Sequence, residues 1–123
     1  MILKDNFYLV NELLFEENTI SAKLQLNADH PIFEGHFPNN PVTPGVIEME
    51  IIKEVVGLAI EQPVKMKAMS SCKFLAILNP NESPEITVNI SIAEREGQRI
   101  RINGSISDAE KSFMKIGAEY FIA

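Results

Sequence analysis

One segment, Val46 to Ile60, constrains the fold more than any other, because it is apolar around most of its predicted helical surface. Thr43, Pro44 and Gly45 precede it. Threonine can cap a helix and proline is tolerated at the first helical position, so we expect the helix to begin there and to run to about Ile60. Its polar positions share one side of a helical wheel: Glu50, Lys53, Glu54, Gly57 and Glu61. The other sides must be covered by protein, and a sheet that curls around one helix would cover them.

Strand-like runs with alternating apolar residues flank this helix on both sides. The expected strands are 7–15, 19–26, 65–78, 85–93, 99–107 and 112–122. Residues 27–44 are rich in proline, glycine, asparagine and histidine, which predicts a long irregular loop. We therefore expect an α+β fold in which an antiparallel sheet of five to six strands wraps around one long helix. The length of 123 residues is typical of a single domain, here 1–123.

The composition and charge narrow the possible classes of function and the compartment of the protein. Apolar residues make up 46% and charged residues 23%, which is typical of a globular protein, and the net charge of −6 argues against a nucleic-acid surface. Charges within 46–60 argue against a membrane span, and the N-terminus lacks the pattern of a secretory signal. The single Cys72 agrees with a reducing compartment, and two histidines with one cysteine argue against a structural zinc site. We expect a cytoplasmic protein that binds no metal.

The loop carries a specific motif: residues 33–46 read FEGHFPNNPVTPGV, and Glu50 follows fourteen positions after His36. This segment resembles the signature of the 3-hydroxyacyl-[acyl-carrier-protein] dehydratases of the FabZ type, roughly F-x-G-H-F-P-x-x-P-V-x-P-G-V with an acidic residue on the following helix. The resemblance implies the hotdog fold, which agrees with the element order expected above. It also implies a hydro-lyase that converts a 3-hydroxyacyl thioester to the trans-2-enoyl thioester without metal or organic cofactor.

The resemblance also assigns roles to the two titratable residues of the motif. Removing water across the 2,3-bond requires at least one base and one acid. His36 matches the family's base, and its imidazole is oriented in the family by the carbonyl that corresponds to Val42. Glu50 matches the acidic residue that protonates or orients the departing hydroxyl. Glu50 also shares the polar side of the helix with Lys53 and Glu54, so a purely structural role for it is the main alternative.

The start of the helix is expected to hold the thioester. Backbone N–H groups at a helix N-terminus can stabilise a developing enolate oxygen, and the Gly45 amide occupies the matching family position. Glycine there would let the thioester approach closely. We expect Phe37, Val42, Pro44 and Gly45 to line the substrate site.

The resemblance further implies a homodimer or higher oligomer, in which the carboxylate of one subunit faces the histidine of another. The carrier would be acyl carrier protein or coenzyme A, in fatty-acid or in polyketide or polyene synthesis. An acidic carrier protein needs a basic docking patch, for which the candidates are Lys65, Lys67, Lys73, Arg99 and Arg101. Two alternatives stay open: a hotdog thioesterase in which Glu50 activates water, and a non-catalytic acyl-binding subunit. Asn39, Asn40 and Glu54 differ from the usual family residues and favour the latter.

Overall fold

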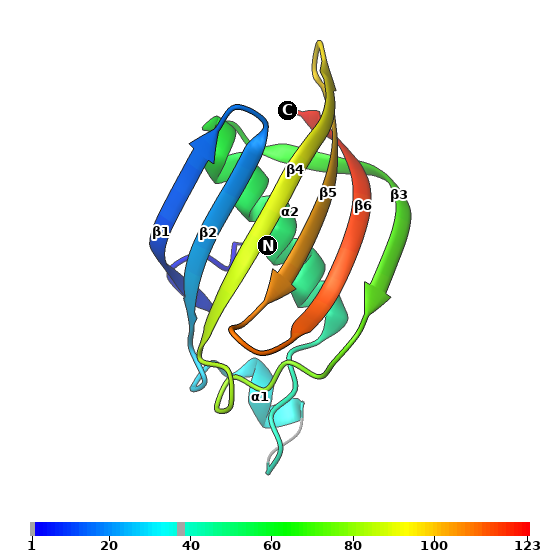
Figure 1. Ribbon diagram of the computed structural model, residues 1–123. Helices are drawn as coiled ribbons and strands as arrows, with labels where there is room; N and C mark the ends of the chain where they lie inside the picture. The colour runs from blue at the N-terminus through cyan, green and yellow to red at the C-terminus, as the bar shows by residue number, and fades with distance from the viewer. Residues whose placement is uncertain (1, 37–38) are drawn as a thin grey trace.

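The computed structural model describes residues 2–36 and 39–123, and its main elements follow the expected order (Figure 1). They are β1 (Tyr8–Glu16), β2 (Thr19–Leu26), α1 (Ile32–Gly35), α2 (Gly45–Ile60), β3 (Val64–Phe74), β4 (Glu85–Glu96), β5 (Arg99–Ser107) and β6 (Ser112–Ile122). The strands form one antiparallel sheet in the order β1-β2-β4-β5-β6-β3. Figure 1 shows this sheet curving around α2, so the α+β hotdog architecture is confirmed.

The core lies between the inner face of the sheet and α2. In β4 every second side chain is buried, from Ile86 to Ile92, because successive residues of a strand point to opposite faces. The helix meets this face with Ile51, Ile52 and Val55, each fully buried. The two-residue period of the strands and the apolar side of the helix therefore bury the same core.

The start of α2 differs by one residue from the expectation. Pro44, with an extended backbone, is the N-cap, and Gly45 is the first helical residue. No side chain caps the helix, so the capping role expected of Thr43 is wrong. The Thr43 backbone N–H instead donates to the Leu78 carbonyl at 2.9 Å, which fixes the residue outside the helix. Its hydroxyl is buried and has no hydrogen-bond partner within the part of the chain that the structure describes.

Further bounds differ: β1 lies one residue later than the expected 7–15, β3 begins one residue earlier than 65, and β4 continues to Glu96 instead of ending at 93. The segment 27–44 is not irregular throughout, because it contains the single turn α1, whose entry is stabilised when His30 Nδ1 accepts the N–H of Ile32 at 3.1 Å. His30 therefore has a structural role at the entry of α1. Strand β3 ends at Phe74 rather than at residue 78. Beyond it the N–H of Leu75 still donates to the Phe113 carbonyl at 2.8 Å, but the chain then leaves β6.

Candidate functional site

The signature loop lies at the end of the sheet where α2 begins (Figure 1). His36 follows α1 directly, is exposed, and donates its backbone N–H to the Phe33 carbonyl at 3.3 Å. The N–H of Val42 donates to the His36 carbonyl at 2.9 Å, so backbone bonds hold the loop on both sides of its tip. The orientation of the imidazole by the Val42 carbonyl stays a prediction. Phe37, expected at the substrate site, lies outside the described residues.

The helix N-terminus is packed closely against the edge strand. A Cβ added to Gly45 would lie 2.7 Å from the Phe74 ring, so only glycine accepts this contact without a shift of the ring. Phe74 is itself 52% exposed and therefore forms one wall beside the helix end. The N–H groups of Ile47 and Glu48 donate to the Pro44 carbonyl at 3.0 and 3.2 Å. The amides before them lack partners within the helix, as at any helix start, and can serve an oxyanion.

Glu50 lies half-buried on the side of α2 that the sheet leaves open. It lines a groove of about 250 Å³ together with residues of α2 and β3: Val46, Met49, Lys53, Lys65 and Met66. The Lys53 ammonium lies 3.1 Å from one Glu50 carboxylate oxygen, an ion pair one turn apart. His36 is not among the described residues that line this groove. Within one chain, this groove therefore does not bring the predicted base and acid together.

Glu54 lies one turn further along the polar side of α2, but hydrogen bonds within the protein hold its side chain. Its carboxylate accepts the backbone N–H groups of Leu3 at 2.8 Å and Lys4 at 3.0 Å, and the Tyr8 hydroxyl at 2.8 Å. Burial and this hydrogen bond raise the pKa of Tyr8 above its ordinary value, so the phenol stays a donor. Glu54 therefore anchors the segment before β1 to the helix, which is a structural role.

Sequence reasoning missed Glu48. It is only 3% exposed, and one of its carboxylate oxygens has no hydrogen-bond partner in the described parts of the chain. Burial raises its pKa to about 8, so the group is largely protonated at neutral pH. Burial and the charge of Glu48 also raise the pKa of Cys72 on β3. The signal was available, because a residue two positions before Glu50 points away from the polar side of a helix.

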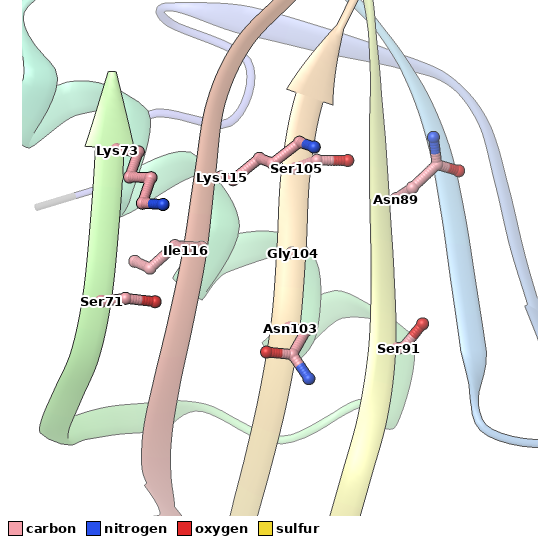
Figure 2. Close-up of a pocket in the computed structure, with 9 residues that line it drawn as sticks. All are labelled: Ser71, Lys73, Asn89, Ser91, Asn103, Gly104, Ser105, Lys115 and Ile116. Carbon is pink, nitrogen blue, oxygen red and sulfur yellow. The ribbon is translucent and has the colours of Figure 1, made fainter. Parts of the chain in front are cut away.

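The outer face of the sheet carries a second hollow of about 410 Å³, which Figure 2 shows. Lys73 and Lys115 face each other across β3 and β6 at one end, and short polar side chains such as Asn103 and Ser105 line the rest. Of the predicted residues, only the docking candidate Lys73 is among the described residues that line it, and no described residue of the signature loop is. Its polar lining is typical of a solvated sheet surface.

Among the basic candidates for carrier docking, three already have acidic partners. Arg99 and Arg101 contact Glu94, and Lys67 lies 3.7 Å from Glu119. Lys65 and Lys73 have no ion pair within the residues described. In residues 2–36 and 39–123 no helix is long and apolar enough to cross a membrane. The same residues contain no group of three His, Cys, Asp or Glu side chains that could hold a metal ion.

Comparisons with known proteins agree with this architecture. The 3-hydroxyacyl-[acyl-carrier-protein] dehydratase FabZ of Caldanaerobacter subterraneus is 28% identical over 93 residues, which span 68% of this chain and 66% of that protein, just under two thirds of its length. The FabZ of Chlamydia pneumoniae is 25% identical, over 92% of this chain and 85% of its own.

Solved structures show the same fold. A chain of the dehydratase heterocomplex ApeI:P from Xenorhabdus doucetiae superposes with a TM-score of 0.71 at 14% identity, over 93% of this chain and 97% of its own. The E. coli PaaI protein gives 0.64 at 9% identity, over 91% and 78%. A family model described as ApeI-like, ApeI dehydratase, matches residues 12–113. This match covers most of the sequence, and the chain belongs to the ApeI-like dehydratase family.

Proposed function

We propose that the protein removes water from a 3-hydroxyacyl thioester, with His36 as the base and Glu50 as the acid. One observation carries the proposal: the loop with His36 is fixed by backbone bonds beside the N-terminus of the helix that presents Glu50 in an open groove. The family membership and the FabZ relatives support this reaction class.

The reaction assigns a step to each group. The neutral imidazole of His36 takes the proton from C2, and the electron pair moves toward the thioester oxygen. Helix N-terminal amides, with Gly45 first, stabilise the negative charge on that oxygen. The enolate then returns its electrons to form the C2–C3 double bond, while the C3–O bond breaks and Glu50 protonates the departing hydroxyl. Water and the trans-2-enoyl thioester leave, and proton transfer resets both residues.

A second copy of the chain completes this site in our proposal. Strand β3 lies at the edge of the sheet and is exposed over most of its length, with Met69 44% exposed. Val46 beside it on α2 is 71% exposed. An exposed edge strand with apolar side chains is a template for pairing with another chain. Pairing there would cover the open side of α2 and bring His36 of one subunit toward the Glu50 groove of the other.

We further propose that the substrate is carried by acyl carrier protein, in fatty-acid or polyketide-like synthesis, with a coenzyme A thioester as the alternative. Lys65 lines the groove of Glu50, and Lys73 follows on the same edge strand β3 but points to the outer face of the sheet, so both charges lie along this edge. They would attract the acidic surface of a carrier protein. Neutral variants of both lysines are expected to raise KM for the protein-bound substrate but not for the coenzyme A thioester.

The direct test presents the purified protein with 3-hydroxyacyl thioesters on both carriers. Formation of the conjugated enoyl thioester, measured by its absorbance, would support the dehydratase reaction. Release of free thiol with no enoyl product would instead establish the thioesterase alternative, in which Glu50 activates water. No turnover of any thioester, with acyl binding retained, would establish the non-catalytic alternative.

A further inference from the structure

We propose that Tyr120 is a positioning residue for Glu50: its hydroxyl donates a hydrogen bond to the Glu50 carboxylate as that group gives its proton to the substrate. The inference rests on the proposed function, because it takes Glu50 as the acid. It assigns a role to a residue outside the signature loop and helix.

The first observation is an unsatisfied group in the core. Tyr120 lies on β6 and is fully buried, yet its hydroxyl has no hydrogen-bond partner in the described parts of the chain. Nearly all buried polar groups in proteins are hydrogen-bonded, so an exception requires an explanation. A buried donor that is unoccupied at rest is available to a group whose charge changes during turnover.

The second observation places Tyr120 next to a residue that lines the groove of Glu50. Tyr120 is the direct cross-strand partner of Met66, and paired residues of antiparallel strands point to the same face. Met66 lines the groove that contains Glu50. Tyr120 therefore lies on the inner face of the sheet beside one wall of that groove.

The surroundings of Tyr120 keep this donor protonated. Burial first, then the charge of Glu50 and the Cys72 thiol, raise the pKa of Tyr120 above its ordinary value. The phenol thus remains an O–H donor through the working range of pH. The other ionisable groups beside Glu50 are Lys53 on the same helix, Lys65 on β3, and Tyr8 on β1, whose pKa is also raised by the Glu50 charge.

The chemistry explains why the bond would matter whenever Glu50 gives up its proton. Proton transfer from Glu50 to the 3-hydroxyl breaks the C3–O bond and leaves a carboxylate on Glu50. A hydrogen bond to the ionised form favours that form, so it strengthens Glu50 as an acid. We expect Tyr120→Phe to lower kcat about tenfold and change KM by less than about twofold, because one hydrogen bond to a charged group is lost. The alkaline limb of the pH–rate profile should move up by about one pH unit.

The chain offers a matched control. Tyr8 is also buried and also near Glu50, but its hydroxyl already donates to Glu54 at 2.8 Å. Tyr8→Phe should therefore lower the thermal stability and leave kcat and the pH limb in place. Tyr120→Phe should instead lower kcat and move the pH limb without loss of thermal stability, because it removes a hydroxyl that has no partner among the described residues. A purely structural role for both tyrosines would give two variants that differ only in stability.

Double variants separate this inference from the proposed function. If Tyr120 acts through Glu50, Tyr120→Phe should cause no further loss of the residual activity of Glu50→Gln. A further tenfold loss in that background would overturn the inference, as would a wild-type kcat and pH limb in Tyr120→Phe alone. Cys72→Ala removes the thiol that also neighbours Tyr120, and it should leave kcat and the alkaline pH limb unchanged. A change equal to that of Tyr120→Phe would assign the hydrogen bond to the Cys72 thiol instead. Full activity of Glu50→Gln would refute the proposed function, and this inference with it.

Discussion

The buried carboxyl of Glu48 should make the protein less stable as the pH rises, and Glu48→Gln should remove this dependence. In an unfolded chain the carboxyl ionises near 4.5, whereas burial raises the pKa in the folded protein to about 8. Between these values the unfolded chain loses the proton and the folded chain keeps it. The folded state therefore loses stability over this range, keeps it below pH 4.5, and shows no further change above pH 8.

The size of the effect follows from the pKa difference. Each pH unit within the range costs about 1.4 kcal/mol, so at pH 7 the cost is on the order of 3 kcal/mol relative to pH 4.5. Glutamine has nearly the same size and cannot ionise. The difference in free energy of unfolding between Glu48→Gln and the wild type should therefore grow in favour of the variant from pH 5 to pH 8.

Urea unfolding at a fixed protein concentration, at several pH values from 5 to 8, measures this difference. Glu61→Gln is the matched control, because Glu61 ends the same helix and is exposed. The control should follow the wild type at every pH. Parallel curves for Glu48→Gln and the wild type would refute the reasoning, because they would show that Glu48 ionises equally in the folded and unfolded states.

Three further predictions concern the site and its support. His36→Ala should lower dehydratase activity roughly 10²–10⁴-fold and leave the melting temperature unchanged, since His36 is exposed. If sites are shared between subunits, an equal mixture of His36→Ala and Glu50→Gln subunits that have exchanged should recover about a quarter of wild-type activity. No recovery would place the site within one chain. Gly45→Ala should lower activity because its Cβ would meet the Phe74 ring at 2.7 Å. Phe74→Ala in the same chain should restore the position of the helix start, which crystallography or NMR would show. Glu54→Gln should cost about 1–3 kcal/mol of unfolding free energy, measured in urea, because a neutral amide replaces a carboxylate that accepts three donors.

Features with a short sequence period could be predicted from the sequence. Strand β5 has the bounds expected from its alternating residues, and α2 ends at Ile60 as expected from its apolar pattern. The start of α2 could not be placed to the residue, because whether Thr43 caps depends on whether Pro44 adopts the extended or the helical conformation. The turn α1 has four residues and is too short to carry a period.

Contacts between distant segments were beyond such reasoning. The partners of Glu54 are the backbone amides of Leu3 and Lys4, about fifty positions away in the chain, and no local pattern indicates them. The orphaned hydroxyl of Tyr120 likewise depends on the pairing of β6 with β3. The signature residues differ in this respect, since His36 and Glu50 were identified by the spacing of a motif rather than by contacts.

The helix α2 thus carries three carboxyl groups within two turns, and their surroundings give them three different behaviours. Glu48 faces the core and keeps its proton at neutral pH. Glu54 is held by three donors and cannot turn toward a substrate without releasing the N-terminal segment. Glu50 lies in an open groove beside β3, where it forms an ion pair with the long flexible side chain of Lys53. Of the three, Glu50 combines an open position with a flexible partner, and this supports our proposal that it is the acid.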